Sequence, residues 1–182
     1  MPVKVWAYCA QDWQQSTSVS AGIPSPVISP PAGTGLDLSE AAAADLVVLN
    51  LHGFAGQPHF YGQANGVIGP TALTVEDIIR REWSGVVVFA EVCFGLLSPI
   101  ARAFHAGGAV FVGSRTEAYG RMHTTLWNGE ADRLAHFFRL LYRPGRSVPA
   151  ILVLAKRFLH VLSLPLDEKD RKTLTSFGVY KP

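Results

Sequence analysis

The sequence predicts an α/β fold, a three-layer sandwich around a mostly parallel central sheet, and three observations carry this prediction. Residues 46–51 and 86–92 form two near-continuous apolar runs, as expected for strands that are buried on both faces. Segments with helical spacing of apolar residues alternate with such runs, which indicates βαβ crossovers between parallel strands. A chain of 182 residues is most simply one domain, covering 1–182.

Each further element is assigned from its pattern and its flanking residues. The expected strands are 3–10, 27–28, 46–51, 86–92, 109–113 and 177–180. The expected helices are 37–44, 74–83, 96–105, 130–142 and 148–162, and the second of these has Thr74 as its N-cap. Residues 16–35 are rich in Pro, Gly and Ser, which predicts an irregular loop. The glycines of 54–70 predict a hairpin or loop over the sheet edge.

Composition and charge narrow the function classes. The hydrophobic fraction of 48% and the charged fraction of 16% fit a compact globular domain. A formal charge of +2, without a cluster of Lys and Arg between aromatic residues, argues against a nucleic-acid partner. The two cysteines make no disulfide framework, and the N-terminus lacks the apolar region of a signal peptide. No apolar run reaches the roughly 18 residues of a membrane span, so we expect a cytoplasmic protein without a membrane partner.

The two buried strands each end in a side chain that is suited to catalysis. His52 and Gly53 follow the first strand, and Cys93 follows the second. Because the carboxyl ends of strands line the binding crevice of an open α/β sheet, the imidazole and the thiol converge if the strands are neighbours. Nucleophilic catalysis requires this arrangement. A helix directly after Cys93 is expected to favour its thiolate, and Gly53 allows a ligand to approach the backbone closely.

Structural roles are the alternative interpretation of the same residues. A free cysteine is often a buried packing residue, which is the role expected of Cys9, and a strand-end histidine is often only hydrogen-bonded. The histidines and cysteines show no zinc-type spacing, and the glycines around 53–56 lack the spacing and the Lys of a phosphate-binding loop. We therefore expect neither a metal nor a cofactor.

The motifs resemble those of the caspase-like (clan CD) cysteine peptidases, in which one apolar strand ends in His-Gly and another in a tripeptide with Cys last. Here these are Leu-His-Gly at 51–53 and Glu-Val-Cys at 91–93. The flanks look most like the CHAT and gingipain-type branch, through Ala-Leu-Thr at 72–74, Phe-Val-Gly-Ser at 111–114, Phe-Phe at 137–138 and Gly-Arg-Ser-Val-Pro-Ala at 145–150. The resemblance covers about 45–160. The short Pro-rich region after the first strand and the ending at 177–182 depart from the family's pattern.

The resemblance implies a cysteine endopeptidase that cleaves a peptide or protein substrate. Cys93 and His52 would form its catalytic dyad and pass through a thioester acyl-enzyme, while the backbone N–H groups of Gly53 and Cys93 would form the oxyanion hole.

The resemblance also implies where the residue before the scissile bond is bound. That pocket is built from the end of the first strand, where Asp12 stands, and from the loop after the third buried strand, where Ser114, Arg115 and Glu117 stand. An acid there would pair with a substrate Arg or Lys through a charge-assisted hydrogen bond, whereas Arg115 would favour an acidic residue. We expect cleavage after Arg or Lys.

Two other functions stay open from the sequence. A glutamine-amidotransferase-like fold also places a cysteine at a strand–helix elbow, but Glu91 replaces the usual first Gly of that elbow. In that superfamily the histidine follows the cysteine, so that His105 or His123 would be required. The third interpretation is a catalytically idle caspase-like module that binds a partner. A homo-oligomer formed through edge strands, or a regulatory partner, is compatible with this fold class.

Overall fold

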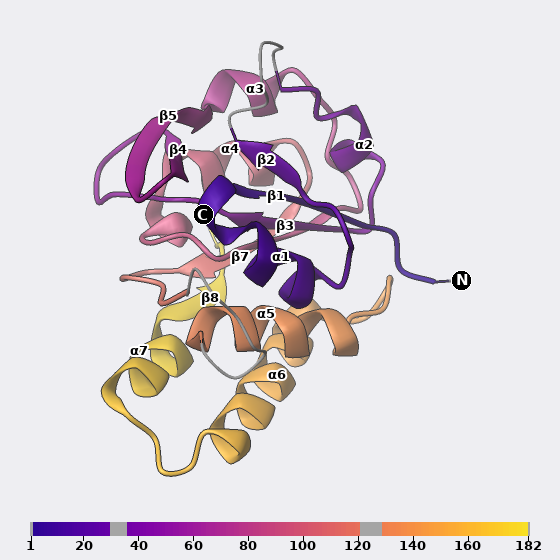
Figure 1. Cartoon of the computed structure of the whole chain (residues 1–182). Helices are drawn as coiled ribbons and strands as arrows, with labels where there is room; N and C mark the ends of the chain where they lie inside the picture. Colours follow the sequence, from indigo (N-terminus) through magenta and orange to yellow (C-terminus); the bar gives the residue numbers. More distant parts are fainter. Residues whose placement is uncertain (1, 30–35, 121–128, 182) are drawn as a thin grey trace.

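The computed structural model describes residues 2–29, 36–120 and 129–181, and its centre is a six-stranded sheet (Figure 1). The strand order is β2-β1-β3-β6-β7-β8. The strands are β1 (Val5–Ala10), β2 (Val27–Ser29), β3 (Leu46–Asn50), β6 (Val87–Ala90), β7 (Val110–Ser114) and β8 (Phe177–Val179). All pairings are parallel except that of β8 with β7. The prediction of an α/β fold with a mostly parallel sheet is confirmed.

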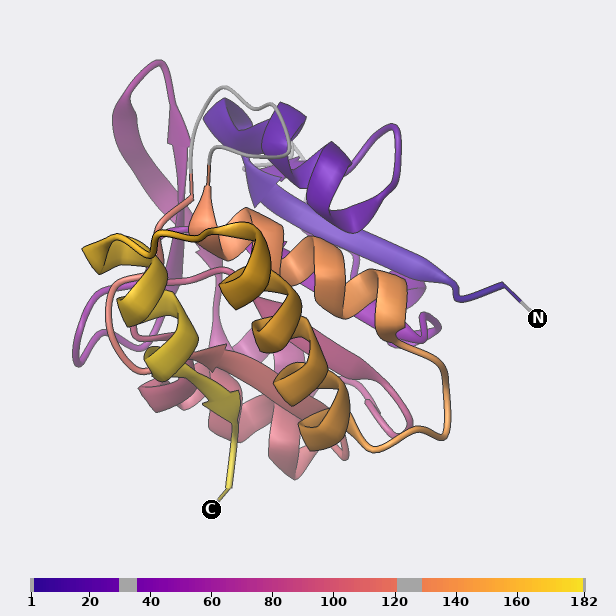
Figure 2. The ribbon, with the colours of Figure 1, turned by 90° about the horizontal axis from the view of Figure 1, so that it is seen from below.

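Helices cover both faces of this sheet, which gives three layers (Figures 1 and 2). One face packs against α2 (Ser39–Ala42), α3 (Val75–Ile79) and α4 (Pro99–Ala106), in a core that contains Trp83 and Phe104. The other face packs against α1 (Gln14–Ala21), α5 (Glu130–Leu141), α6 (Val148–Leu162) and α7 (Glu168–Ser176), around Phe89 and Phe138. Because alternate residues of a strand point to opposite faces, Val88 and Phe89 of β6 enter different cores.

Two helices were not expected from the sequence. The prediction of an irregular loop from residue 16 is wrong, because Gln14–Ala21 forms α1. The buried face of α1 consists of Ala21 and of small hydroxyl residues, among them Ser16 and Thr17, which accept hydrogen bonds from Asn50 Nδ2 at 3.4 and 3.1 Å. The second helix, α7, has few apolar residues and begins with a capping box between Asp167 and Asp170. Apolar periodicity detects neither helix, since both lack a broad apolar stripe.

Several helix boundaries also differ from the expectation. The helix expected over 96–105 starts later, because Phe94 has a left-handed backbone (φ 55°) and only a single 3-10 turn, Gly95–Leu97, precedes α4. The helix expected over 74–83 ends at Ile79, whereas its start is confirmed: Thr74 accepts a hydrogen bond from Asp77 N, and the Asp77 carboxylate accepts one in return.

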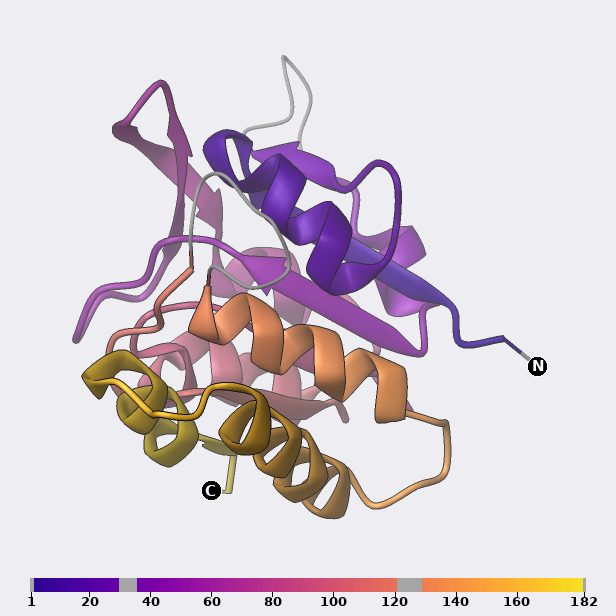
Figure 3. The same cartoon turned by 60° about the horizontal axis from the view of Figure 1, so that its bottom comes forward.

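A hairpin of β4 (Phe60–Ala64) and β5 (Val67–Leu73) projects from the sheet edge (Figure 3). Its turn residues, Asn65 and Gly66, both have positive φ (52° and 76°), as a tight two-residue hairpin turn requires. The Asp12 carboxylate accepts hydrogen bonds from both turn N–H groups, at 2.9 and 2.8 Å. Asp12 therefore fastens the hairpin to the segment that follows β1.

Candidate active site

The strand ends that carry His52 and Cys93 lie side by side. Strands β3 and β6 are neighbours, and Glu91 N donates to Leu49 O at 2.7 Å just before the two strands end. Gly53 then packs directly on the backbone of Cys93, so closely that a Cβ on Gly53 would collide with the Cys93 carbonyl oxygen. Only glycine fits such an approach. The two motifs are thus brought to one edge of the sheet, as their positions after parallel strands predicted.

The imidazole of His52 is held from three sides. The ring of Trp13 lies 4.4 Å from it between centroids, and the ring of Phe54 stacks at 6.3 Å with an interplanar angle of 10°. Nε2 is in hydrogen-bond contact with Gln63 Oε1, which comes from β4 of the hairpin. The backbone of His52 also pairs with that of Tyr61, at 2.8 and 2.9 Å. The hairpin therefore fixes the position of the imidazole ring.

The Cys93 thiol is held by the backbone of Ala118. Sγ donates to Ala118 O at 3.6 Å and accepts from Ala118 N at 3.3 Å. Burial raises the pKa of the Cys93 thiol and the charge of Glu117 raises it further, while the Ala118 N–H opposes these effects. The expected thiolate is not supported, because the raising effects of burial and of Glu117 outweigh that of the Ala118 N–H. Between the described residues, no hydrogen bond joins this thiol to the imidazole.

The four residues expected in the specificity pocket lie in different settings. Asp12 binds the hairpin turn, as described above. Ser114 is buried and its Oγ donates to Ser176 Oγ at 2.9 Å, and the Arg115 guanidinium lies against Gly178 of β8. Glu117 has a half-exposed side chain, next to the residue that binds the thiol, with Lys172 Nζ at 4.0 Å. Of these four, Glu117 combines solvent access with an electrostatic effect on the thiol.

A buried pair of acids, which sequence reasoning did not single out, lies beneath the same sheet edge. Glu91 is 4% exposed and accepts a hydrogen bond from Ser20 Oγ at 3.1 Å. Burial and the neighbouring Asp132 raise the pKa of Glu91 well above its usual value. A methyl group on Gly120 would lie 3.7 Å from both Asp132 carboxylate oxygens and 4.0 Å from Asn50 Oδ1, so both side chains lie beside Gly120. The pair of Glu91 and Asp132 is stable when the two carboxyl groups share a proton, because two carboxyl groups in contact cannot both ionise.

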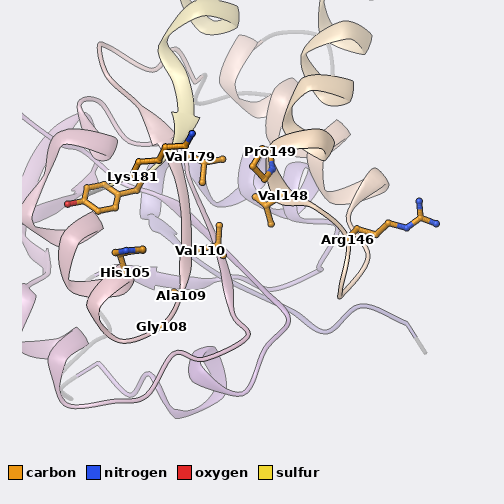
Figure 4. Close-up of a pocket in the computed structure, with 10 residues that line it drawn as sticks. His105, Gly108, Ala109, Val110, Arg146, Val148, Pro149, Val179 and Lys181 are labelled. Atoms are coloured by element: carbon orange, nitrogen blue, oxygen red, sulfur yellow. The ribbon is translucent and has the colours of Figure 1, made fainter.

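An amidotransferase-like site would require His105 or His123. His105, on α4, lines a cavity of about 480 Å³ at the opposite edge of the sheet, where β7 begins. Val110, Val148 and Val179 line this cavity together with Arg146 (Figure 4). His123 lies outside the described residues. The histidine that an amidotransferase-like site requires after the cysteine is therefore not found at Cys93 in the described part of the chain.

One cluster of acids has the spacing of a metal site. Oxygen atoms of Glu130, Asp167 and Asp170 lie within 4.8 Å of one another. Arg133 occupies the cluster, with its guanidinium 2.9 Å from Asp170 and 3.8 Å from Glu130. Because the guanidinium already pairs with the two buried carboxylates, Glu130 and Asp170, the cluster serves to join α5 to α7.

The chain matches no protein-family model, and no curated protein is significantly similar to it. In the ranges that the structure describes, no helix has both the length and the apolar character that crossing a bilayer requires.

Proposed function

We propose that the chain is a caspase-like cysteine endopeptidase in which Cys93 is the nucleophile and His52 the acid and base. One observation carries this proposal: the backbone contact of Gly53 with Cys93, which joins the two catalytic-type motifs at the carboxyl ends of adjacent parallel strands. This edge is where the ligands of open α/β sheets bind. The rigid setting of the imidazole between Trp13 and Gln63 supports a catalytic role, because catalysis depends on held geometry.

The proposed reaction follows from the protonation states at the site. Because its pKa is raised, the Cys93 thiol is protonated at neutral pH, so its proton must pass to His52 as Sγ attacks the scissile carbonyl carbon. His52 then delivers that proton to the leaving amine. Water then loses a proton to His52 and attacks the thioester carbonyl carbon. The C–S bond breaks, the new C-terminal carboxyl group is released, and Sγ takes back the proton from His52. The backbone N–H groups of Gly53 and Cys93 would bind the oxyanion, which typically contributes several kcal/mol to transition-state stability.

The proposed specificity is cleavage after Arg or Lys, and the carboxylate of Glu117 would bind the cation of that substrate residue. The carboxylate of Glu117 is partly exposed beside the thiol, so a substrate cation bound to it would also lower the cost of forming the thiolate. A Glu117→Gln variant should therefore raise KM for peptides with Arg or Lys before the bond more than for neutral peptides. A cytoplasmic setting suits the proposed enzyme, because both cysteines are free thiols.

The decisive experiment is hydrolysis of a fluorogenic peptide panel in which the residue before the bond is Arg, Lys, Asp or Leu. The wild-type chain is compared with Cys93→Ala and His52→Ala, and Cys9→Ala is the matched control. We expect cleavage after Arg and Lys that both site variants abolish and the control retains. Undiminished activity of Cys93→Ala would refute the proposal, and cleavage after Asp alone would move the specificity from Glu117 to Arg115.

An idle caspase-like interaction module is the second candidate, and the state of the thiol favours it. A protonated thiol that both donates to and accepts from Ala118 is satisfied without a substrate. In that case a peptidyl electrophile such as an Arg-directed acyloxymethyl ketone should not label Cys93. Labelling that stops in the His52→Ala variant, measured by intact mass, would instead support the peptidase.

A further inference from the structure

Helix α6 presents an apolar face to solvent on the outside of the helical layer (Figure 2). Its large exposed hydrophobic side chains are between 43 and 64% exposed: Val153, Leu154, Phe158, Val161 and Leu162. The opposite face, with Ile151, Leu152, Ala155 and Leu159, is buried against the rest of the molecule. A contiguous apolar surface of this kind on a globular domain marks an interaction site.

The shape of this face fits a helix. An open surface hollow of about 280 Å³ lies among Leu154, Arg157, Phe158 and Val161, which are spaced i, i+3, i+4 and i+7. Four residues at these positions form the hole that accepts one knob side chain of a facing helix in knobs-into-holes packing. The ring of Phe158 is held in place, because it stacks on Phe137 at a centroid distance of 5.9 Å. The hole is therefore a formed feature of the folded domain.

The charges of α6 indicate which kind of helix fits. Its residues include the cations Lys156 and Arg157 and neither Asp nor Glu. Lys156 donates to Phe177 O at 2.7 Å, whereas Arg157 has no ion-pair partner in the described part of the chain. A carboxylate beside the knob would pair with Arg157. A second copy of α6 would bring no carboxylate to pair with Arg157, because α6 contains neither Asp nor Glu.

We propose that the α6 face is a docking site for an amphipathic helix of another protein, whose apolar ridge is flanked by acidic residues. The knob of that helix fills the hole at Phe158, and its carboxylate pairs with Arg157. A membrane surface fits less well, because interfacial helices carry a polar face rich in Lys and Arg, and α6 has one unpaired cation. The proposal does not depend on whether Cys93 is catalytic.

The test uses the full chain and a fluorescent three-heptad peptide with Leu at a and d and Glu at e and g. A twin peptide carries Lys at e and g. Fluorescence anisotropy should show binding of the Glu peptide, and Phe158→Ser should weaken it at least tenfold. Val161→Ser, at 64% exposure, should act in the same direction, whereas Ile79→Ser on α3, also 64% exposed, should have no effect. Circular dichroism verifies that each variant is folded.

Charge reversal provides the sharpest outcome. Arg157→Glu should invert the preference, so that the Lys peptide binds more tightly than the Glu peptide. The proposal is overturned if neither peptide binds, or if Arg157→Glu leaves the preference unchanged. A wild-type dimer in size-exclusion chromatography that Phe158→Ser converts to a monomer would make a second copy the occupant. If the wild-type protein sediments with phosphatidylserine vesicles and Phe158→Ser abolishes this, the occupant of the α6 face would be a membrane.

Discussion

Replacing Glu91 with Gln tests whether the acid two residues before Cys93 carries a proton in the folded protein. Burial and the adjacent Asp132 hold its pKa well above the usual range. A carboxyl group with a raised folded-state pKa contributes its full stability below the unfolded pKa, and this contribution is lost as the pH rises through the folded value. The protein should therefore lose stability from about pH 4.5 upward, and a carboxamide, which never ionises, should remove this loss.

The expected size follows from proton linkage. Between the unfolded and the folded pKa, the folded state holds one proton more than the unfolded state. The free energy of unfolding therefore falls by about 1.4 kcal/mol for each pH unit in this range. In a domain of this length 1 kcal/mol shifts Tm by roughly 2–4 °C, so Glu91→Gln should gain about 3–6 °C on wild type per pH unit in that range. The carboxamide can still accept the hydrogen bond from Ser20 and donate one to Asp132, so the substitution can keep both contacts of Glu91.

The assay is thermal unfolding of both proteins from pH 4.5 to 8 at constant ionic strength. Glu82→Gln, at an exposed carboxylate next to a buried tryptophan, is the matched control and should follow wild type at every pH. A difference between Glu91→Gln and wild type that stays constant with pH would refute the reasoning. So would a variant that becomes less stable than wild type as the pH rises, because Glu91 would then be ionised and paired with a cation.

Three further predictions concern the same region and the helical layer. Gly53→Ala should cost on the order of 2–4 kcal/mol in urea unfolding, because its methyl group collides with the Cys93 carbonyl, whereas Gly69→Ala, which meets nothing closer than 3.8 Å, should not. Iodoacetamide should alkylate Cys93 faster than Cys9, because burial raises the pKa of Cys9 to about 12. The alkylation rate of Cys93 should keep rising at pH values above the pKa of an ordinary thiol, because its own pKa is raised as well. Equal rates for the two cysteines would contradict this. Arg133→Ala should lower stability by roughly 3–5 kcal/mol, because it leaves buried carboxylates without their cation, and an unchanged denaturation midpoint would count against that ion pair.

The sequence could predict the helices and strands that bury apolar side chains. Helix α6 matches its expected bounds of 148–162 because its buried residues recur at helical spacing, and the central strands match because they are continuous apolar runs. Helix α1 could not be predicted this way, because it buries hydroxyl groups against Asn50 and so has no apolar stripe. Its buried polar face becomes intelligible only when the strand that carries Asn50 is placed beside it.

At the candidate site, too, the sequence could predict the positions of the residues but not their contacts with distant segments. His52 and Cys93 could be placed together from sequence, because parallel strands deliver their carboxyl ends to one edge. The protonation state of the thiol could not be predicted, because it depends on burial and on contacts with Ala118 and Glu117, which lie 24–25 residues further along the chain. Glu91 did carry a signal of its own. An acid within the apolar run 86–92 must be buried with the strand, and a buried acid needs a partner or a proton. Which partner it has, Asp132, depends on the packing of α5 over the sheet, and no local pattern encodes that contact.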